Sequence, residues 1–165
     1  MMQLQNTTSS SKVAFVLSVF FALVLAMLSV ADSIYYFWPE WLVLVLIFWC
    51  YTEPDRYGPL TGFILGILLD VLTVKTFGVL SLGLAFIAFF VNKTSHQMKV
   101  MTTWQQSLLV ALFLAILKFI TGWVYGMTDE FSFTWSFWYS IIGSMIAWPF
   151  LTIVLGELRR VSRIR

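Results

Sequence analysis

Two ionisable side chains, Asp70 and Lys118, lie inside apolar segments of the sequence. A charge in hydrocarbon is costly, so it is normally turned into the protein interior and paired. If both segments are helices that run outward, Asp70 lies about 13 residues, or roughly 20 Å, along its helix, and Lys118 about 11 residues, or roughly 17 Å. These similar depths predict that Asp70 and Lys118 form an ion pair within the membrane.

Each of these charges also has a simpler interpretation. Lys118 can extend its ammonium group into a water-filled cavity, and Asp70 can cap the outer end of its own helix near Lys75. The sequence does not decide between this arrangement and the ion pair.

Small residues recur at four-residue spacing, which places them on one face of a helix. One such series leads up to Asp70 and consists of Gly58, Gly62 and Gly66. Small faces let a second backbone come close. We predict that these faces serve either packing within the protein or docking of a partner's transmembrane helix. Similar series occur nearer the two ends of the chain, at Ala14, Ser18, Ala22 and Ala26, and at Ser136, Ser140 and Ser144.

Sequence motifs of enzymes are absent from the chain. His96 and Cys50 are each the single residue of their type, and no metalloprotease, phosphate-binding or catalytic-triad motif is present. Basic residues flank apolar segments and do not form a basic patch for nucleic acid. The sequence therefore predicts a protein that is not an enzyme, with no cofactor, no metal and no nucleic-acid partner.

Composition places the chain in a membrane. Of its 165 residues 60% are hydrophobic and 11% are charged, against about 25% charged residues in soluble domains. We predict an all-α membrane protein, a compact bundle of six transmembrane helices in residues 13–156, with a frayed polar tail at 1–12 and a basic tail at 157–165. The predicted segments are 13–31, 41–51, 57–74, 77–91, 107–127 and 133–156, and the longest polar connection is 92–106.

Two of these segments have open alternatives. Residues 41–51 are too few for a straight crossing, which takes about 20 residues, so this segment is either a short helix extended by its flanks or a re-entrant piece. The first segment ends in Ser29-Val30-Ala31, which resembles a signal-peptide cleavage site, although its only preceding positive charge is Lys12.

The distribution of lysine and arginine predicts the orientation. With six crossings, eight basic residues lie on the side of the termini and Lys75 alone lies on the other. The positive-inside rule then places both termini in the cytoplasm. The basic tail, with Arg159, Arg160, Arg163 and Arg165, is expected to contact anionic membrane lipids.

Several short motifs, in their order and spacing, resemble the rod shape-determining protein MreD family of bacteria. They are WPEWL from Trp38, GFILGILLD from Gly62 to Asp70, TFG from Thr76 to Gly78, WQQ from Trp104, Phe137-Trp138 and Trp148-Pro149. The resemblance marks Gly62, Gly66, Asp70 and Gly78 as family-type positions.

The resemblance implies a multi-pass inner-membrane component of the cell-elongation machinery. Such a protein is not known as an enzyme, associates with MreC, and through it connects MreB filaments to the peptidoglycan synthases RodA and PBP2. In size and helix number the chain is also similar to the substrate-binding subunits of energy-coupling-factor vitamin transporters. A small-solute transporter subunit is therefore the alternative, and it requires a ligand-sized cavity between the third and fifth segments.

Overall fold

The computed structural model describes residues 2–28, 37–73, 78–127 and 136–164, and within them all regular structure is α-helical. The helices are α1 (Met2–Met27), α3 (Trp41–Thr52), α4 (Pro59–Thr73), α5 (Val79–Val100), α6 (Thr103–Met127) and α7 (Ser136–Ile164). Three of them, α5, α6 and α7, contain stretches long and apolar enough to cross a membrane, whereas the apolar parts of the other three are shorter. The all-helical class is thus confirmed, with three candidate membrane spans.

Two expectations about connections and tails are wrong. Residues 92–100 continue α5, so the predicted polar connection shrinks to the junction between Val100 and Thr103. One side of this last part of α5 faces the interior, because Ser95 and Met98 are buried. At the start of the chain, the polar residues from Met2 onward form the first turns of α1 and not a frayed tail.

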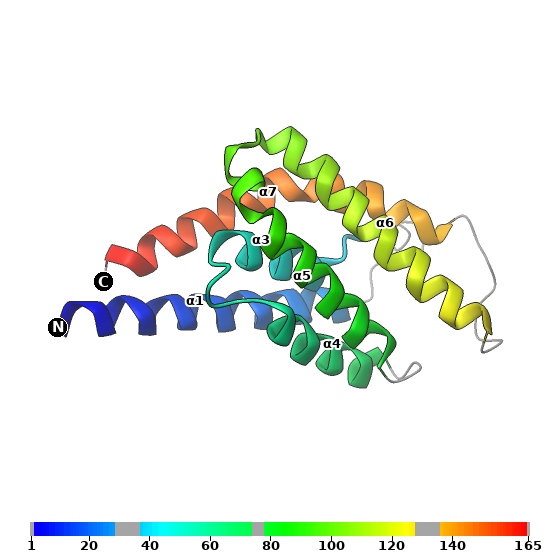
Figure 1. Cartoon of the computed structure of the whole chain (residues 1–165), viewed down its shortest axis with the longest axis horizontal. Helices are drawn as coiled ribbons and strands as arrows, with labels where there is room; N and C mark the ends of the chain where they lie inside the picture. Colours follow the sequence, from blue (N-terminus) through cyan, green and yellow to red (C-terminus); the bar gives the residue numbers. More distant parts are fainter. Residues whose placement is uncertain (1, 29–36, 74–77, 128–135, 165) are drawn as a thin grey trace.

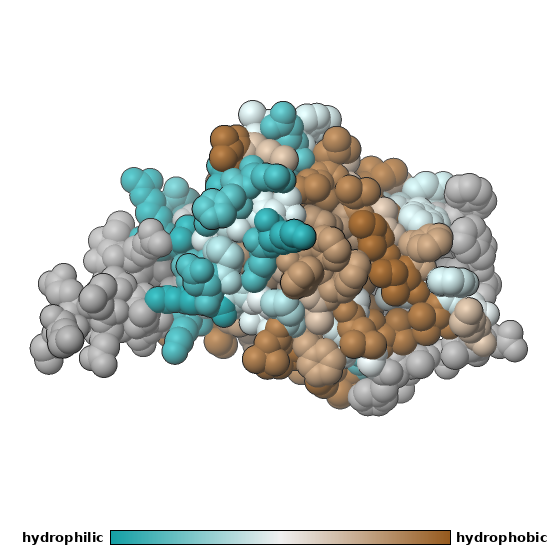
Figure 2. All heavy atoms as spheres, in the orientation of Figure 1, coloured by the Kyte–Doolittle hydropathy of each residue, from teal (hydrophilic) through white to brown (hydrophobic). Residues whose placement is uncertain are grey.

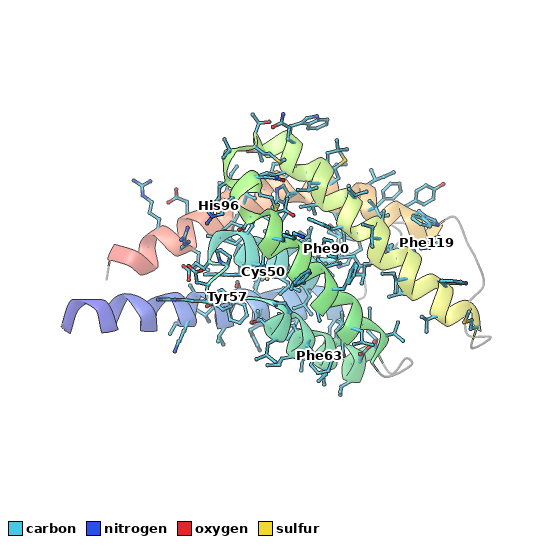
Figure 3. All side chains as sticks on the ribbon, viewed as in Figure 1. Cys50, Tyr57, Phe63, Phe90, His96 and Phe119 are labelled. Carbon is cyan, nitrogen blue, oxygen red and sulfur yellow. The ribbon has the colours of Figure 1, made fainter. Side chains whose placement is uncertain are left out.

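Helix α3 is the core of the molecule. All nine residues from Leu42 to Cys50 are buried, as expected for a helix that is apolar all round. Helices α1, α5, α6 and α7 pack against it, and Cys50 lies among them in the interior (Figure 3). At 12 residues the helix is roughly 18 Å long. Residues 41–51 therefore form a short helix that is enclosed by the longer ones.

The outer helices pack side by side around this core, in an order that differs from their order in the chain. Helix α1 packs against α7, α7 against α6, α6 against α5, and α5 against α4 (Figure 1). The ends of α1 and α7 that lead to the two termini are at the same end of the molecule (Figure 1). Helix α4 is at the margin of this arrangement, because α5 is its principal neighbour.

Outward-facing side chains form an apolar belt. Figure 2 shows hydrophobic surface over the middle of the molecule and hydrophilic surface toward the end where the termini lie. Every outer helix contributes exposed large side chains, for example Phe20, Ile64, Phe86, Leu112 and Phe150, and Phe63 and Phe119 project from different sides (Figure 3). Such a belt suits contact with lipid chains.

The glycine face of α4 is filled by α5. A Cβ atom on Gly62 would lie 2.6 Å from the carbonyl oxygen of Leu84, and one on Gly66 would overlap the backbone of Ser81. Nearer the start of α4, a Cβ on Gly58 would meet the Asn92 amide at 3.0 Å. The absence of side chains at Gly62 and Gly66 therefore lets the backbones of α4 and α5 come close at these two positions.

This contact predicts a specific sensitivity to one added methyl group. Gly66→Ala should destabilise the protein by about 1–3 kcal/mol, because the methyl group meets backbone that cannot move aside cheaply. Gly126→Ala is the matched control, since a Cβ there meets nothing within 4 Å. Thermal unfolding of the purified full chain in detergent measures the difference, and equal melting temperatures for the two variants would contradict the packing described.

Candidate functional site

Asp70 lies one helical turn beyond Gly66 and caps the start of α5. Its Oδ2 accepts hydrogen bonds from the backbone N–H of Gly78 at 3.0 Å, the N–H of Ser81 at 3.2 Å and the Ser81 hydroxyl at 2.6 Å. Its Oδ1 accepts one from the N–H of Leu80 at 3.3 Å. These N–H groups have no partner within α5, and the helix N-terminus carries partial positive charge. The fully buried carboxylate is thus stabilised by α5.

The predicted ion pair between Asp70 and Lys118 is wrong. The Asp70 carboxylate is engaged by the first turn of α5, and the Lys118 ammonium bonds to Glu40 instead. A capping role for Asp70 was the alternative, but the capped end belongs to the next helix and not to its own. Lys75, the residue expected near it, lies outside the described residues.

Gly78 makes this capping geometry possible. It is the N-cap residue of α5 and has a φ of 94°, a conformation that costs a residue with a side chain about 1 kcal/mol or more. Its N–H can then point at Asp70 together with those of Leu80 and Ser81.

The capping interaction predicts a graded loss of stability. Asp70→Ala leaves buried N–H groups unpaired and should cost about 3 kcal/mol, whereas Asp70→Asn keeps one acceptor oxygen and should cost roughly half as much. Thr73→Ala, an exposed position one turn away, is the control. Hydrogen exchange should report faster exchange of the first-turn amides of α5 in Asp70→Ala, a smaller increase in Asp70→Asn and no increase in Thr73→Ala. Unchanged exchange there would contradict the capping role.

Lys118 and Glu40 form a second charge contact inside the bundle. The Lys118 Nζ lies 2.9 Å from the Glu40 Oε1, and the exposed fractions of the two side chains are 9% and 36%. Glu40 immediately precedes α3, and its backbone N–H donates to the Ser144 hydroxyl of α7 at 3.0 Å. Because α3 is short, the residue at its start reaches the level of a lysine that lies well inside α6. Glu40 thereby links the start of α3 to α6 through its carboxylate and to α7 through its backbone N–H.

Sequence reasoning noted Glu40 as part of the WPEWL motif and missed this role. The available signal was its position directly before an apolar segment too short for a crossing. With such a segment, a residue at its border lies within the membrane and requires a partner.

The Glu40–Lys118 contact predicts an asymmetric mutant pattern. Glu40→Gln leaves a buried ammonium group without this carboxylate and should destabilise by about 2 kcal/mol. Lys118→Met should cost less, because the Glu40 side chain, at 36% exposed, is less buried than the Lys118 side chain at 9%. The double variant should be closer to wild type than the sum of the single effects, since it removes both charges and leaves neither one without its partner. Additive losses in thermal unfolding would contradict the pairing.

Helix α3 also ends in a charge contact. Arg159 Nε of α7 donates to Glu53 Oε1 at 3.2 Å, and Arg56 lies 3.6 Å from the other oxygen. Beside it, the Asn92 amide donates to the Pro54 carbonyl oxygen at 3.2 Å. Of the predicted basic tail, Arg159 therefore contacts the bundle, and Arg160 lies 3.8 Å from Glu157. The side chains of Arg163 and Arg165 lie outside the described residues.

The small-residue face of α1 is mostly internal. Ala14, Ser18 and Ala22 are buried, while Ala26 is exposed. The Ser18 hydroxyl accepts a hydrogen bond from Trp49 of α3 at 2.9 Å. On α7, Ser140 and Ser144 are likewise buried, and the side chain of Ser136 lies outside the described residues. The small-residue faces of α1 and α7 therefore serve contacts within the chain.

Taken together, the enclosed helix, the internally paired charges and the apolar belt define a helical membrane protein. The sequence matches the model of the family described as rod shape-determining protein MreD over residues 9–157. It is 32% identical over 127 residues to the rod shape-determining protein MreD of Haemophilus influenzae, and the match covers 74% of this chain and 75% of that protein. No solved structure matches. The chain belongs to the MreD family, and its role is in rod-shape determination.

Proposed function

We propose that this chain is a non-enzymatic scaffold of the cell-elongation machinery in the bacterial inner membrane. It supports cell-shape maintenance and peptidoglycan synthesis by binding the transmembrane helix of MreC, and through MreC it is connected to MreB, RodA and PBP2. The observation that carries this proposal is the family match over residues 9–157, which includes every helix of the bundle at least in part. Six crossings with both termini in the cytoplasm belong to the same proposal.

The interior of the bundle supports a scaffold that works by holding a fixed shape. The Asp70 carboxylate and the Glu40–Lys118 pair bind groups of the same chain, and the glycine face of α4 is filled by α5. A partner helix therefore meets side chains that already have defined positions. Binding to a preorganised surface avoids part of the entropic cost of association.

The outer face of α4 is the surface that we assign to the partner helix. Helix α4 has α5 as its principal neighbour, and a second helix would enclose it further. Helix association within lipid depends on close van der Waals packing, which a continuous face of large side chains can provide. That face contains Leu60, Ile64, Ile67, Leu68 and Val71, all exposed.

The transporter alternative has less support. It requires a cavity between the third and fifth predicted segments, which correspond to α4 and α6, and the cavity described below lies elsewhere, between α3, α5 and α7. The family match also concerns shape determination.

Co-purification and site-specific photo-crosslinking test the scaffold proposal. The full chain should co-purify with MreC in stoichiometric amount from detergent-solubilised membranes. A photo-reactive residue at Ile64, which is 58% exposed, should crosslink to MreC, whereas one at Leu112 of α6, which is 55% exposed, should not. Failure of co-purification would contradict the scaffold, and crosslinking at Leu112 but not Ile64 would contradict the assigned face only.

A further inference from the structure

A cavity of about 490 Å³ that is open to the surface lies where α3, α5 and α7 approach the end of the molecule that holds the termini. Its volume falls within the range of known ligand sites, about 300–1,000 Å³. The lining combines aromatic, hydroxyl and basic side chains from the three helices. These residues are Phe48, Tyr51, Thr52, Lys99, Thr152, Gly156, Arg159 and Arg160.

The charge around this cavity is positive. Of its three basic side chains, Arg159 is held by Glu53 at 3.2 Å. Arg160 has only a long contact of 3.8 Å with Glu157, and both side chains are largely exposed, at 74% and 65%. Among the described residues, no ion pair involves Lys99. Two basic groups therefore remain available for an anion, while Arg159 is positioned by the bundle.

The cavity lies where a lipid headgroup would be found. Figure 2 shows the hydrophilic surface toward this end meeting the apolar belt. Along α7, Arg160 is preceded at helical spacing by Ile153, Phe150 and Ile146, which are 67%, 67% and 71% exposed. Residues at this spacing share one face of a helix. The same face of α7 thus presents a cation near the cavity and an apolar path leading away from it into the belt.

We propose that this cavity binds the phosphate headgroup of an anionic phospholipid. Lys99 and Arg160 contact the phosphate, Tyr51 and the threonine hydroxyls lie within reach of its polar remainder, and one acyl chain follows the exposed face of α7. Basic pockets between membrane helices on the cytoplasmic side are suited to such headgroups. This inference does not depend on the identity of any protein partner.

Native mass spectrometry of the full chain in detergent, titrated with phosphatidylglycerol, tests the proposal. The wild-type protein should retain phosphatidylglycerol in preference to phosphatidylcholine. Lys99→Gln and Arg160→Gln should each weaken retention about five-fold, and the double variant about 25-fold, because each substitution removes one cation from the phosphate. Lys93→Gln is the matched control, because Lys93 is an exposed lysine of the same helix as Lys99 and does not line the cavity.

Three results would overturn the proposal. Equal retention of the two lipids by the wild-type protein would show no preference for an anionic headgroup. An equal decrease with Lys93→Gln would indicate general attraction to a basic surface and not a site. Binding of glycerol phosphate as tight as that of the lipid would identify a site for soluble anions. Because these variants replace exposed or partly exposed charges, a matching size-exclusion profile verifies that each remains folded.

Discussion

The contact on which the arrangement of α4 and α5 depends is the capping of one helix by a carboxylate from another. Asp70 accepts the N–H groups at the start of α5, so the end of α4 is tied to one point of its neighbour. From there the antiparallel register is determined. Gly66 faces Ser81, Gly62 faces Leu84 and Ala88, and Gly58 faces Asn92. A buried carboxylate or N–H group without a partner would be costly here, and a shifted register would create both.

Polar contacts solve a related problem for α3. A helix that is apolar on all sides has no hydrophobic stripe to determine its rotation or its depth. Carboxylates just outside its two ends supply that information, since Glu40 pairs with Lys118 of α6 and Glu53 with Arg159 of α7. Between them, Trp49 donates to Ser18 of α1. The two ion pairs and the hydrogen bond of the Trp49 indole therefore determine the rotation and depth of α3. Burial of its apolar side chains supplies the stabilisation.

Features that depend on local composition could be predicted from the sequence, and features that depend on relative helix depth could not. The helical class follows from long apolar segments, and the small faces of α1 and α4 follow from four-residue spacing. The predicted partner of Lys118 was wrong because the depth comparison considered only the segments that contain Asp70 and Lys118 and left out the short segment 41–51. With α3 only 12 residues long, Glu40 reaches Lys118, and Asp70 lies near the end of α4, beside α5. Residues 92–100 were predicted as a connection because they are polar, but they continue α5, and Ser95 and Met98 are buried on its inner side.

These internal contacts bear on how a scaffold of this kind can recognise a partner. The charges are paired inside the bundle and the glycines are covered by α5, so the outer face of α4 consists of branched aliphatic side chains. In lipid, a face of this kind gains little from the hydrophobic effect, because acyl chains are equally apolar. Selectivity must then come from shape, and shape is specific only when the helix that carries it is held rigidly. The buried capping of α5 by Asp70 and the close backbone contact at Gly66 provide that rigidity at the far end of α4.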